Sequence, residues 1–527
     1  MVKVIEGQKV WSDFQTSGNV GTITNFFSKQ FLDKSYNTFQ LSIEHYIEEI
    51  SLYGLDTVFV DNQIIESDHE WYKARRGELV NYCKNNDINL VVIKNTTTKV
   101  NQTFKKAFVM EINVEAKDYF IDGMILQVPL LLNEDEFNPV NSVKDKDITF
   151  YSIGKMDSSK SLQTFNSKVK PTNRIISEPK MTSHNLKKLS SYVKKSRILY
   201  IGNTNLLDSI TLAYIETMAL LNSTYVVYDY RIDVKSKYGF QSLDDTTNIN
   251  QIRFLINNKE FSLKKTLGIQ RKVLLENTFI FKSTLNQFLK KESVAQTVPQ
   301  ISVITATNRK HNLDDYFNRL SEQKLVEVEV NLVTHGFELS SSEIGHYKNK
   351  YNFNINVQSA DVKENLGNCL NKAIMECNFP IITKMDDDDF YFEHYLIDQF
   401  IALKYSNSDI VGKYEAYYYF EEEDVIVKRS IGHYYEKGNF ILGASIMSTE
   451  KVMKDLMFAD LPKAVDTNFL RRAVEYGAEI YVGHPFEMCV FRGANLEQHT
   501  WKINNLMMLK SAKVLGYGEP SSYVKLT

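Results

Sequence analysis

Four consecutive carboxylates mark the second half of the chain. Asp386, Asp387, Asp388 and Asp389 follow an apolar run at 379–383 and the pair Lys384-Met385. Acidic side chains at this spacing repel one another, so a run of them that leaves an apolar strand needs a compensating cation. The sequence therefore predicts a divalent metal site at the end of a buried strand.

Alternating strands and helices must position this run. A new domain is expected to begin after Val298-Pro299-Gln300, because a fresh apolar strand follows directly. The expected elements are a strand at 301–305, a helix at 313–324, strands at 326–333 and 355–357, a helix at 366–377 and a strand at 381–383. This alternation predicts a parallel α/β sheet, which binds its ligands beyond the carboxyl ends of its strands.

Asp466 is a further carboxylate in a position suited to chemistry. It follows Ala464-Val465 and precedes a helical run at 469–476, which puts it at a helix N-terminus. An aspartate at such a place commonly caps the helix. A carboxylate can also act as a base that takes a proton from a hydroxyl group, which is the alternative to a cap.

Residues 298–527 resemble the family 2 glycosyltransferases, which have the GT-A fold. The matching segments are Ile301-Ser302-Val303-Ile304-Thr305-Ala306-Thr307-Asn308-Arg309, Asn365-Leu366-Gly367 with Leu370-Asn371-Lys372-Ala373, and Met385-Asp386-Asp387-Asp388-Asp389 in the place of the family's DxD motif. Gly443-Ala444-Ser445 and Asp466-Thr467-Asn468-Phe469, with Arg472 and Gly477, complete the order. The resemblance implies an inverting transfer of a sugar from a nucleotide sugar.

The resemblance also implies roles for the acids. The leaving nucleoside diphosphate gathers negative charge, which Mn²⁺ or Mg²⁺ held by carboxylates would stabilise. By the family pattern, Asp388 binds the metal, Asp386 contacts the metal or the donor, and Asp387 and Asp389 support them. Asp389 has an alternative role as a cap for a helix near Glu393. Asp466 becomes the base that activates the acceptor hydroxyl.

Further ligands follow from the same pattern. His484 and His499 are candidates for another metal ligand, and His499 is preferred. Arg492, after the apolar run 488–491, is expected either to meet the diphosphate or to form a salt bridge. The residues expected to bind the nucleotide sugar are Thr305, Thr307, Asn308, Arg309, Asn365, Asn371, Asp386 and Arg492.

One segment departs from the family pattern. The second strand usually ends in an acidic pair and Gly-Ser, with an Asp that contacts the base, whereas Val333-Thr334 leads here into His335-Gly336-Phe337. Recognition of the base is therefore left open, with a UDP-sugar as the default donor.

The first 290 residues are expected to form two Rossmann-like α/β domains. The expected elements are a helical region at 15–50, a strand at 56–61, a helix at 71–85, strands at 88–93, 107–112, 124–132 and 148–153, a strand at 197–202, a helix at 209–221, a strand at 224–228 and a helix at 285–293. The polar stretch 158–180 is typical of a linker. The predicted domains are 1–165, 166–294 and 295–527.

This half resembles the spore maturation protein B family, whose members have a GT-B-like pair of Rossmann domains. The matching segments are Val60-Asp61-Asn62, Glu66-Ser67 with Trp71, residues 82–88, Leu131-Leu132-Asn133 with Phe137-Asn138-Pro139, and residues 275–279. Asn277 stands where that family often has His, and Gly202-Asn203-Thr204-Asn205 is not a GxGxxG fingerprint. A module that binds acceptor, nucleotide or partner is expected, with a second glycosyltransferase site as the alternative.

Composition narrows the class of protein. The chain of 527 residues has a net charge of -3, with 43% hydrophobic and 24% charged residues, which is unlike a disordered chain or a polybasic nucleic-acid binder. Four scattered cysteines give no disulfide framework, and no stretch approaches the roughly 20 apolar residues of a membrane-spanning helix. A cytoplasmic protein without a nucleic-acid partner is expected, and peripheral association with the inner face of a membrane is left open.

Together these patterns predict an inverting, metal-dependent glycosyltransferase. It would move a hexose or N-acetylhexosamine to a hydroxyl group of a cell-surface glycopolymer or related glycan, as in polysaccharide biosynthesis. One alternative is a noncatalytic carbohydrate-binding scaffold that keeps the fold. Another is a nucleotidyltransferase, but Thr305-Ala306-Thr307-Asn308-Arg309 lacks the glycine-rich loop usual in that class.

Overall fold

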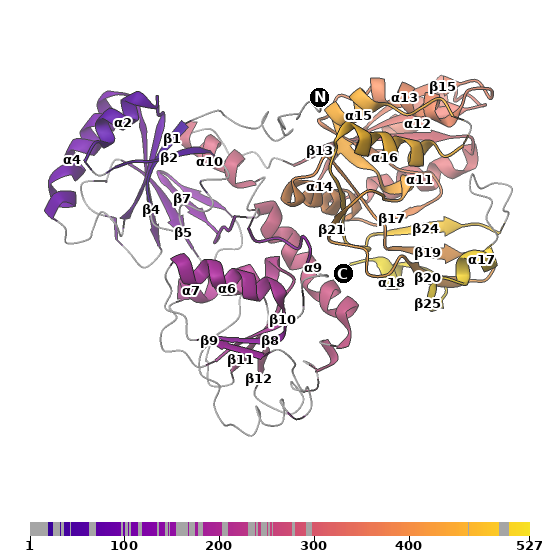
Figure 1. The fold of residues 1–527 in the computed structure, drawn as a ribbon. Coiled ribbons are helices and arrows are strands. Elements are labelled where there is room, and N and C mark those ends of the chain that lie inside the picture. Colours follow the sequence, from indigo (N-terminus) through magenta and orange to yellow (C-terminus); the bar gives the residue numbers. More distant parts are fainter. Residues whose placement is uncertain are drawn as a thin grey trace. The chain divides into compact units, whose positions relative to one another are not determined.

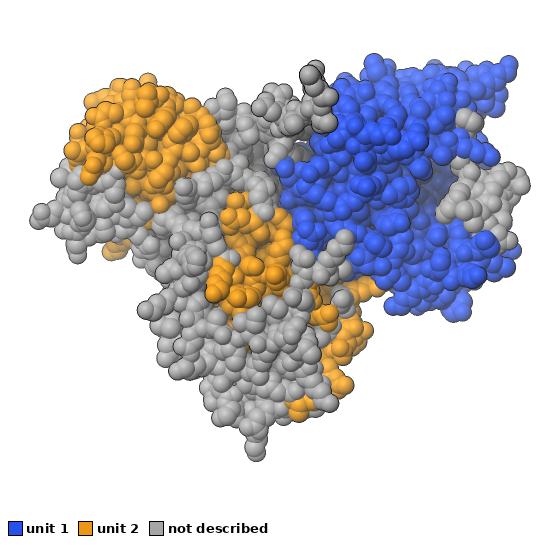
Figure 2. All heavy atoms as spheres, in the orientation of Figure 1, with its two compact units in different colours: residues 1–10, 140–144, 298–527 blue, residues 11–139, 145–297 orange. Residues whose placement is uncertain are grey.

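The protein, described by a computed structural model, divides into two compact units (Figure 2). Unit 1 contains residues 1–10, 140–144 and 298–527, and unit 2 contains residues 11–139 and 145–297. The structure describes residues 19–24, 32, 36–42, 44–62, 70–95, 99–100, 104, 107–113, 119–133, 136–142, 146, 148–153, 167, 174–177, 183–202, 209–229, 238, 241–243, 250, 253–255, 257–276, 280–290, 298–461, 463–494 and 505–526. The three-domain division of the sequence stays a prediction.

Unit 1 is built on an eight-stranded sheet (Figure 1). Four parallel strands come first, in the order β15 (Asn354–Ala360), β14 (Glu327–His335), β13 (Gln300–Thr307) and β16 (Ile381–Lys384). The sheet continues through β22 (Met447–Thr449), β18 (Ile410–Gly412), β23 (Ile480–Val482) and β21 (Glu436–Gly438). β13, β14 and β16 are almost wholly buried, as expected for parallel strands that helices cover on both faces.

Helices of unit 1 alternate with these strands. They are α11 (Leu313–Ser321), α12 (Ser341–Lys350), α13 (Leu366–Met375), α14 (Tyr395–Ser406), α15 (Glu450–Leu456) and α16 (Val465–Tyr476). The buried face of α13 supplies Cys369, Leu370 and Ala373 to a core that also holds Ile304 of β13 and Phe469 of α16. This packing fixes the carboxyl ends of β13 and β16 relative to the start of α16.

A second sheet of unit 1 has five strands. Its order is β17 (Phe390–Tyr391), β24 (Met488–Arg492), β19 (Ala416–Phe420), β20 (Val425–Arg429) and β25 (Lys513–Tyr517). The short helices α17 (Asn505–Leu509) and α18 (Ser521–Val524) lie near the end of the chain. None of the helices in the described part of the chain combines the length and the apolarity needed to cross a bilayer.

Unit 2 contains a seven-stranded sheet and a five-stranded sheet. The first has the order β2 (Asn37–Gln40), β1 (Asn19–Ile23), β3 (Thr57–Asp61), β4 (Asn89–Asn95), β5 (Phe108–Ile112), β7 (Ile125–Val128) and β6 (Phe120–Asp122). The second has the order β12 (Gln241–Leu243), β11 (Tyr225–Asp229), β10 (Ser196–Ile201), β8 (Ile148–Ile153) and β9 (Arg174–Ser177). Only β6 pairs antiparallel in these two described sheets.

The parallel α/β class predicted for this half is confirmed, while the GT-B-like arrangement stays a prediction. The helices of unit 2 are α2 (Tyr46–Leu52), α4 (Glu70–Asn85), α6 (Ser183–Lys195), α7 (Ser209–Leu221), α9 (Lys259–Leu275) and α10 (Phe281–Lys290). α7 is apolar and almost completely buried, which explains why its sequence has no polar face.

Two local predictions for this half are wrong, and one is confirmed. The region 15–50, expected to be helical, contains β1 and β2, because pairing of β1 with β3 outweighs local helix propensity. The strand predicted at 148–153 is confirmed as β8, which pairs with β10 and β9. The linker expected at 158–180 contains β9, where only two isoleucines mark an edge strand in a polar stretch.

Candidate functional site

The acid run connects the two sheets of unit 1. It leaves the carboxyl end of β16, where all four residues Ile381–Lys384 are buried, and enters β17 of the second sheet at Phe390. The Thr305 hydroxyl of β13 donates to the Met385 carbonyl at 2.7 Å and also contacts the Tyr316 hydroxyl. The main chain before the run is therefore fixed by the neighbouring strand and by α11, and Thr305 supports the run rather than facing a ligand.

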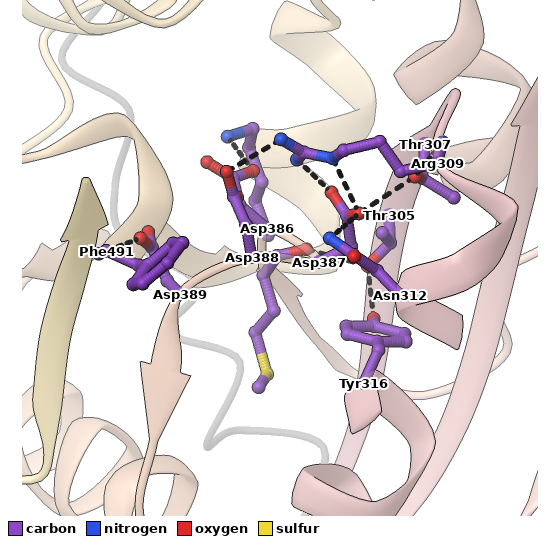
Figure 3. A network of polar contacts seen from close by, with 12 residues as sticks. Thr305, Thr307, Arg309, Asn312, Tyr316, Asp386, Asp387, Asp388, Asp389 and Phe491 are labelled. Atoms are coloured by element: carbon purple, nitrogen blue, oxygen red, sulfur yellow. Dashed lines mark hydrogen bonds and ion pairs between the residues drawn. The ribbon is translucent and has the colours of Figure 1, made fainter. Parts of the chain in front are cut away.

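Asp387 is the buried anchor of the run. Its Oδ2 accepts hydrogen bonds from Thr307 Oγ1 at 2.9 Å, Arg309 Nε at 2.9 Å and Asn312 Nδ2 at 3.0 Å (Figure 3). Arg309 Nη2 also donates to Asp387 Oδ1. Only 2% of the Asp387 side chain is exposed, and Thr307 and Arg309 meet the acid run directly. The supporting role of Asp387 stays a prediction.

Asp388 shares the same arginine but is less enclosed. Arg309 Nη1 donates to Asp388 Oδ2 at 2.8 Å. Burial raises the pKa of Asp388, and repulsion from Asp386 and Asp387 raises it further, while Arg309 opposes both effects only in part. One cation thus serves two carboxylates, which leaves an excess of negative charge at this point.

Lys384 joins the acid run to Asp466. Its Nζ donates to Asp386 Oδ1 at 2.6 Å and lies 3.6 Å from Asp466 Oδ2, although the lysine side chain is only 3% exposed. The side chains of Asp386 and Asp466 are 38% and 31% exposed, so both carboxylates reach solvent. The buried ammonium group therefore holds together two carboxylates from segments 80 residues apart.

A glycine makes room for Asp466 in the first turn of α16. A Cβ atom at Gly443 would lie 2.1 Å from Asp466 Oδ2, so any side chain there would displace the carboxylate. Burial raises the pKa of Asp466, while Lys384 acts in the opposite direction. Asp466 Oδ1 is buried and has no hydrogen-bond partner among the described residues. A carboxylate with one unsatisfied oxygen and a raised pKa is a candidate base.

Asp389 holds the second sheet against the run. Its Oδ1 accepts a hydrogen bond from the Phe491 amide of β24 at 2.8 Å, and Arg319 donates to its carbonyl. Burial raises the pKa of Asp389 well above its usual value. The alternative prediction, a cap for the helix near Glu393, is wrong because α14 begins at Tyr395 after His394 and Asp389 bonds β24 instead.

The carboxylates fit a metal ion that arrives with a diphosphate. Among the described residues, no group of three or more His, Cys, Asp or Glu side chains could hold a metal ion alone. Asp386 Oδ2 and Asp388 Oδ1 have no hydrogen bond within this part of the chain, since the cations bind the other oxygens. Mg²⁺ and similar ions are commonly held by one or two carboxylates together with substrate phosphates. His499 lies outside the described residues.

The other predicted ligands have varied positions. Asn308 is exposed, whereas Asn365 Nδ2 donates to Asp460 Oδ1 at 2.6 Å. Both amide atoms of Asn371 bond the main chain of Phe458, which gives it a structural role in this conformation. Arg492 is buried beside the run, where burial lowers its pKa and Asp388 and Asp389 oppose that effect.

His484 has a partner other than the acid run. Its Nε2 lies 3.0 Å from Asp398 Oδ2, and both side chains are buried. Lys413 Nζ donates to the His484 carbonyl at 2.6 Å, which fixes the segment further. The structure thus assigns His484 to a buried pair with α14.

Two contributors to the site are not recognised in the sequence. Lys384 bridges Asp386 and Asp466, and the Tyr391 hydroxyl accepts from the Asp386 amide at 3.0 Å and donates to the Ala444 carbonyl at 2.7 Å. A lysine at the end of an otherwise apolar strand is a usable signal, because such a charge needs a buried partner. Tyr391 gives no comparable signal.

Comparisons with known proteins find only partial structural similarity. No protein-family model matches the chain, and no curated protein matches it. Part of the chain is similar to S. aureus TarS, with 17% identity over 36% of this chain and 36% of TarS and a TM-score of 0.29. The structure of TarS 1–349 in complex with UDP-GlcNAc gives 18% identity over 37% and 58% of the two chains, with a TM-score of 0.29.

A mannosyltransferase also resembles part of the chain. PcManGT from Pyrobaculum calidifontis, solved with GDP-Man and Mn²⁺, shares 12% identity over 45% of this chain and 66% of its own, with a TM-score of 0.30. The matched region therefore spans less than two thirds of each of these chains. Structural similarities with TM-scores this low decide neither the fold nor the activity of this chain. The fold is described here from its own sheets and contacts.

Proposed function

We propose that unit 1 is an inverting, metal-dependent glycosyltransferase of the GT-A type. The observation that carries the proposal is that Lys384 holds Asp386 beside Asp466 at the carboxyl end of β16, while Arg309 holds Asp388 in the same acid run. Ligands bind at this edge in parallel α/β sheets. The donor is a nucleotide sugar, with a UDP-sugar as the default, and the acceptor is a hydroxyl group of a glycan or cell-surface glycopolymer.

In the proposed reaction, Asp466 takes the proton of the acceptor hydroxyl as that oxygen attacks the anomeric carbon. The bond from the anomeric carbon to the diphosphate breaks, and the nucleoside diphosphate leaves with the bonding electron pair. Asp386 and Asp388 would hold Mn²⁺ or Mg²⁺, which when bound supplies positive charge to the diphosphate. Lys384 and Gly443 support the base by fixing the Asp466 carboxylate beside the acid run.

Release of nucleoside diphosphate tests the proposal. The wild-type protein, supplied with a panel of nucleotide sugars, Mn²⁺ and glycan acceptors, should release nucleoside diphosphate, and Asp388→Ala should abolish the stimulation by Mn²⁺. Asp466→Asn should lower kcat by roughly 10²- to 10⁴-fold, because it removes the general base. Gly443→Ala should lower kcat by about 10²-fold through displacement of Asp466.

Asp315→Asn is the matched control for these variants. Asp315 is an exposed carboxylate on α11 in the same unit and lies outside the site. Full turnover in Asp388→Ala and Asp466→Asn would contradict the proposal. Glycan binding without turnover in the wild type would instead identify a noncatalytic scaffold, and release of pyrophosphate would identify a nucleotidyltransferase.

A further inference from the structure

Three aromatic rings form a partly exposed surface on unit 1. The Tyr414 and His433 rings lie 5.5 Å apart, and the Tyr414 and Phe440 rings lie 5.7 Å apart, both in edge-to-face geometry. Phe440 is 40% exposed and the His433 side chain is 54% exposed. These three residues are called the Tyr414 surface. An arrangement in which large rings remain open to solvent while packed on one another is suited to binding a flat ligand.

The main chain holds the Tyr414 surface in place. The Leu442 amide donates to the Lys413 carbonyl at 2.7 Å, and the Glu415 amide donates to the His433 carbonyl at 3.2 Å. Tyr414 is therefore flanked by two segments that carry Phe440 and His433. A Cβ atom at Gly412 would lie 2.9 Å from the Ser445 carbonyl oxygen, so the strand end and residues 441–445 approach closely. The rings are presented by a fixed scaffold.

A segment of three residues links the Tyr414 surface to the site. Phe440 precedes Gly443 by three residues, so their Cα atoms are at most about 11 Å apart. Gly443 adjoins the Asp466 carboxylate, and its carbonyl accepts from Lys384 Nζ at 3.4 Å. The next carbonyl, that of Ala444, accepts from the Tyr391 hydroxyl. A ligand on the rings would thus extend toward Asp466 within the length of a short oligosaccharide.

We propose that the Tyr414 surface is the acceptor subsite and binds the C–H face of a pyranose ring of the glycan. This inference rests on the proposed function, because it takes Asp466 as the base. A pyranose with equatorial hydroxyl groups presents polarised C–H bonds on its faces, and aromatic faces carry the complementary negative charge. Phe440 provides the accessible ring, with Tyr414 packed against it.

Polar groups at the edge of this surface would bind the sugar's hydroxyl groups. His433 Nδ1 lies 3.0 Å from Glu436 Oε1, and its Nε2 has no hydrogen bond among the described residues. Asn439, next to Phe440, is exposed. A carbohydrate therefore fits the combination better than a purely apolar peptide segment, which would leave these polar groups unused.

Saturation-transfer NMR tests the inference without donor or metal. The probes are methyl β-D-glucopyranoside and methyl N-acetyl-β-D-glucosaminide, and wild-type protein should transfer saturation to their ring C–H protons. Phe440→Leu keeps apolar bulk but removes the ring, so binding should weaken by about fivefold. Phe440→Tyr keeps the ring and should retain binding, which separates loss of stacking from loss of folding.

Tyr517→Ala is the matched control, because Tyr517 is an exposed aromatic residue on β25 of the same unit. It should bind both probes as the wild type does. Absence of transfer in the wild type, or equal transfer in Phe440→Leu, would overturn the acceptor subsite. Failure of the proposed transferase is distinguishable, because it appears as absence of nucleoside diphosphate release from the wild type and does not affect this NMR comparison.

Discussion

The carboxyl ends of β16 in unit 1 and β3 in unit 2 are both polar, but their polar groups have different partners. After β3, Asn62 is fully buried and its Nδ2 donates to the Lys99 carbonyl at 3.2 Å. After β16, the carboxylates are held by side chains, chiefly those of Arg309 and Lys384. The Asn62 amide bonds the main chain, whereas the carboxylates of Asp386, Asp387 and Asp388 bond charged side chains.

This difference separates the Asn62 contact from the contacts of the acid run. A main-chain carbonyl is fixed by its own fold and cannot be exchanged for a ligand. A side-chain cation that shares its charge among several carboxylates leaves some of their oxygens open, and it can move when a metal or a phosphate arrives. The acid run therefore combines an anchored carboxylate, Asp387, with the less enclosed Asp386 and Asp388.

The largest expected difference between the two strand ends is in stability. Asp387→Ala leaves Arg309 half-buried without its main partner, and removal of one partner of a buried ion pair costs about 3–5 kcal/mol. Asn62→Ala removes one neutral hydrogen bond to main chain and should cost about 1 kcal/mol. Hydrogen exchange resolved by peptide measures the opening free energy of β13 and β16 separately from that of β3 and β4.

Equal losses of stability in Asp387→Ala and Asn62→Ala would contradict this difference between the two strand ends. Asp387→Asn serves as the intermediate case, because it keeps a hydrogen-bond acceptor for Thr307 and Asn312 while removing the charge that Arg309 needs. Its cost should fall between those of Asp387→Ala and Asn62→Ala.

The sequence predicts the positions of the strands around the acid run better than it predicts the partners of each acid. Apolar runs predict β13, β14 and β16, and the run of four carboxylates at a strand end marks the candidate site. The hydrogen bonds to Asp387 come from Thr307, Arg309 and Asn312, which lie at least 75 residues away along the chain. Only the register of β13 against β16 brings them together.

The same reasoning explains the errors in unit 2. β1 and β9 are short strands whose pairing partners lie elsewhere in the sequence, so their local composition carries little signal. Mainly apolar strands such as β4 and β10 are located correctly, because burial on both faces is visible in the sequence.

A second, smaller effect concerns the cation between Asp386 and Asp466. Lys384→Met keeps the length of the buried side chain but leaves two carboxylates facing each other without their ammonium partner. Since both carboxylates are about one third exposed, water screens them, and the expected cost is about 2 kcal/mol rather than the full value for a buried pair. Thermal unfolding measures this loss.

Addition of Mn²⁺ provides a second measurement on Lys384→Met. A divalent ion at the acid run would replace the missing positive charge, so saturating Mn²⁺ should raise the melting temperature of Lys384→Met more than that of the wild type. Lys437→Met is the control, because the Lys437–Glu479 pair is exposed and should contribute less than about 0.5 kcal/mol. An equal effect of Mn²⁺ on all three proteins would show that the ion binds elsewhere.

The smallest expected effect is the pH dependence of stability in the metal-free protein. Burial raises the pKa values of Asp388, Asp389 and Asp466 above the usual 3.8. As the pH falls, these carboxyls take up protons in the folded state before they do so in the unfolded state. The free energy of unfolding should therefore rise as the pH falls from neutral through the folded pKa values, and the gain is complete below the unfolded value.

Asp389→Asn identifies the source of this slope. It removes the titrating carboxyl with the strongly raised pKa while keeping an acceptor for the Phe491 amide, so the melting temperature should vary less between neutral and mildly acidic pH. Partly exposed carboxyls with lowered pKa values, such as Glu364 and Asp455, act in the opposite direction only near and below their usual range. The contrary result is a wild-type melting temperature that falls steadily as the pH is lowered from neutral. It would mean that the acid run is not held as charged, buried carboxylates. The contrast with the end of β3 would then disappear.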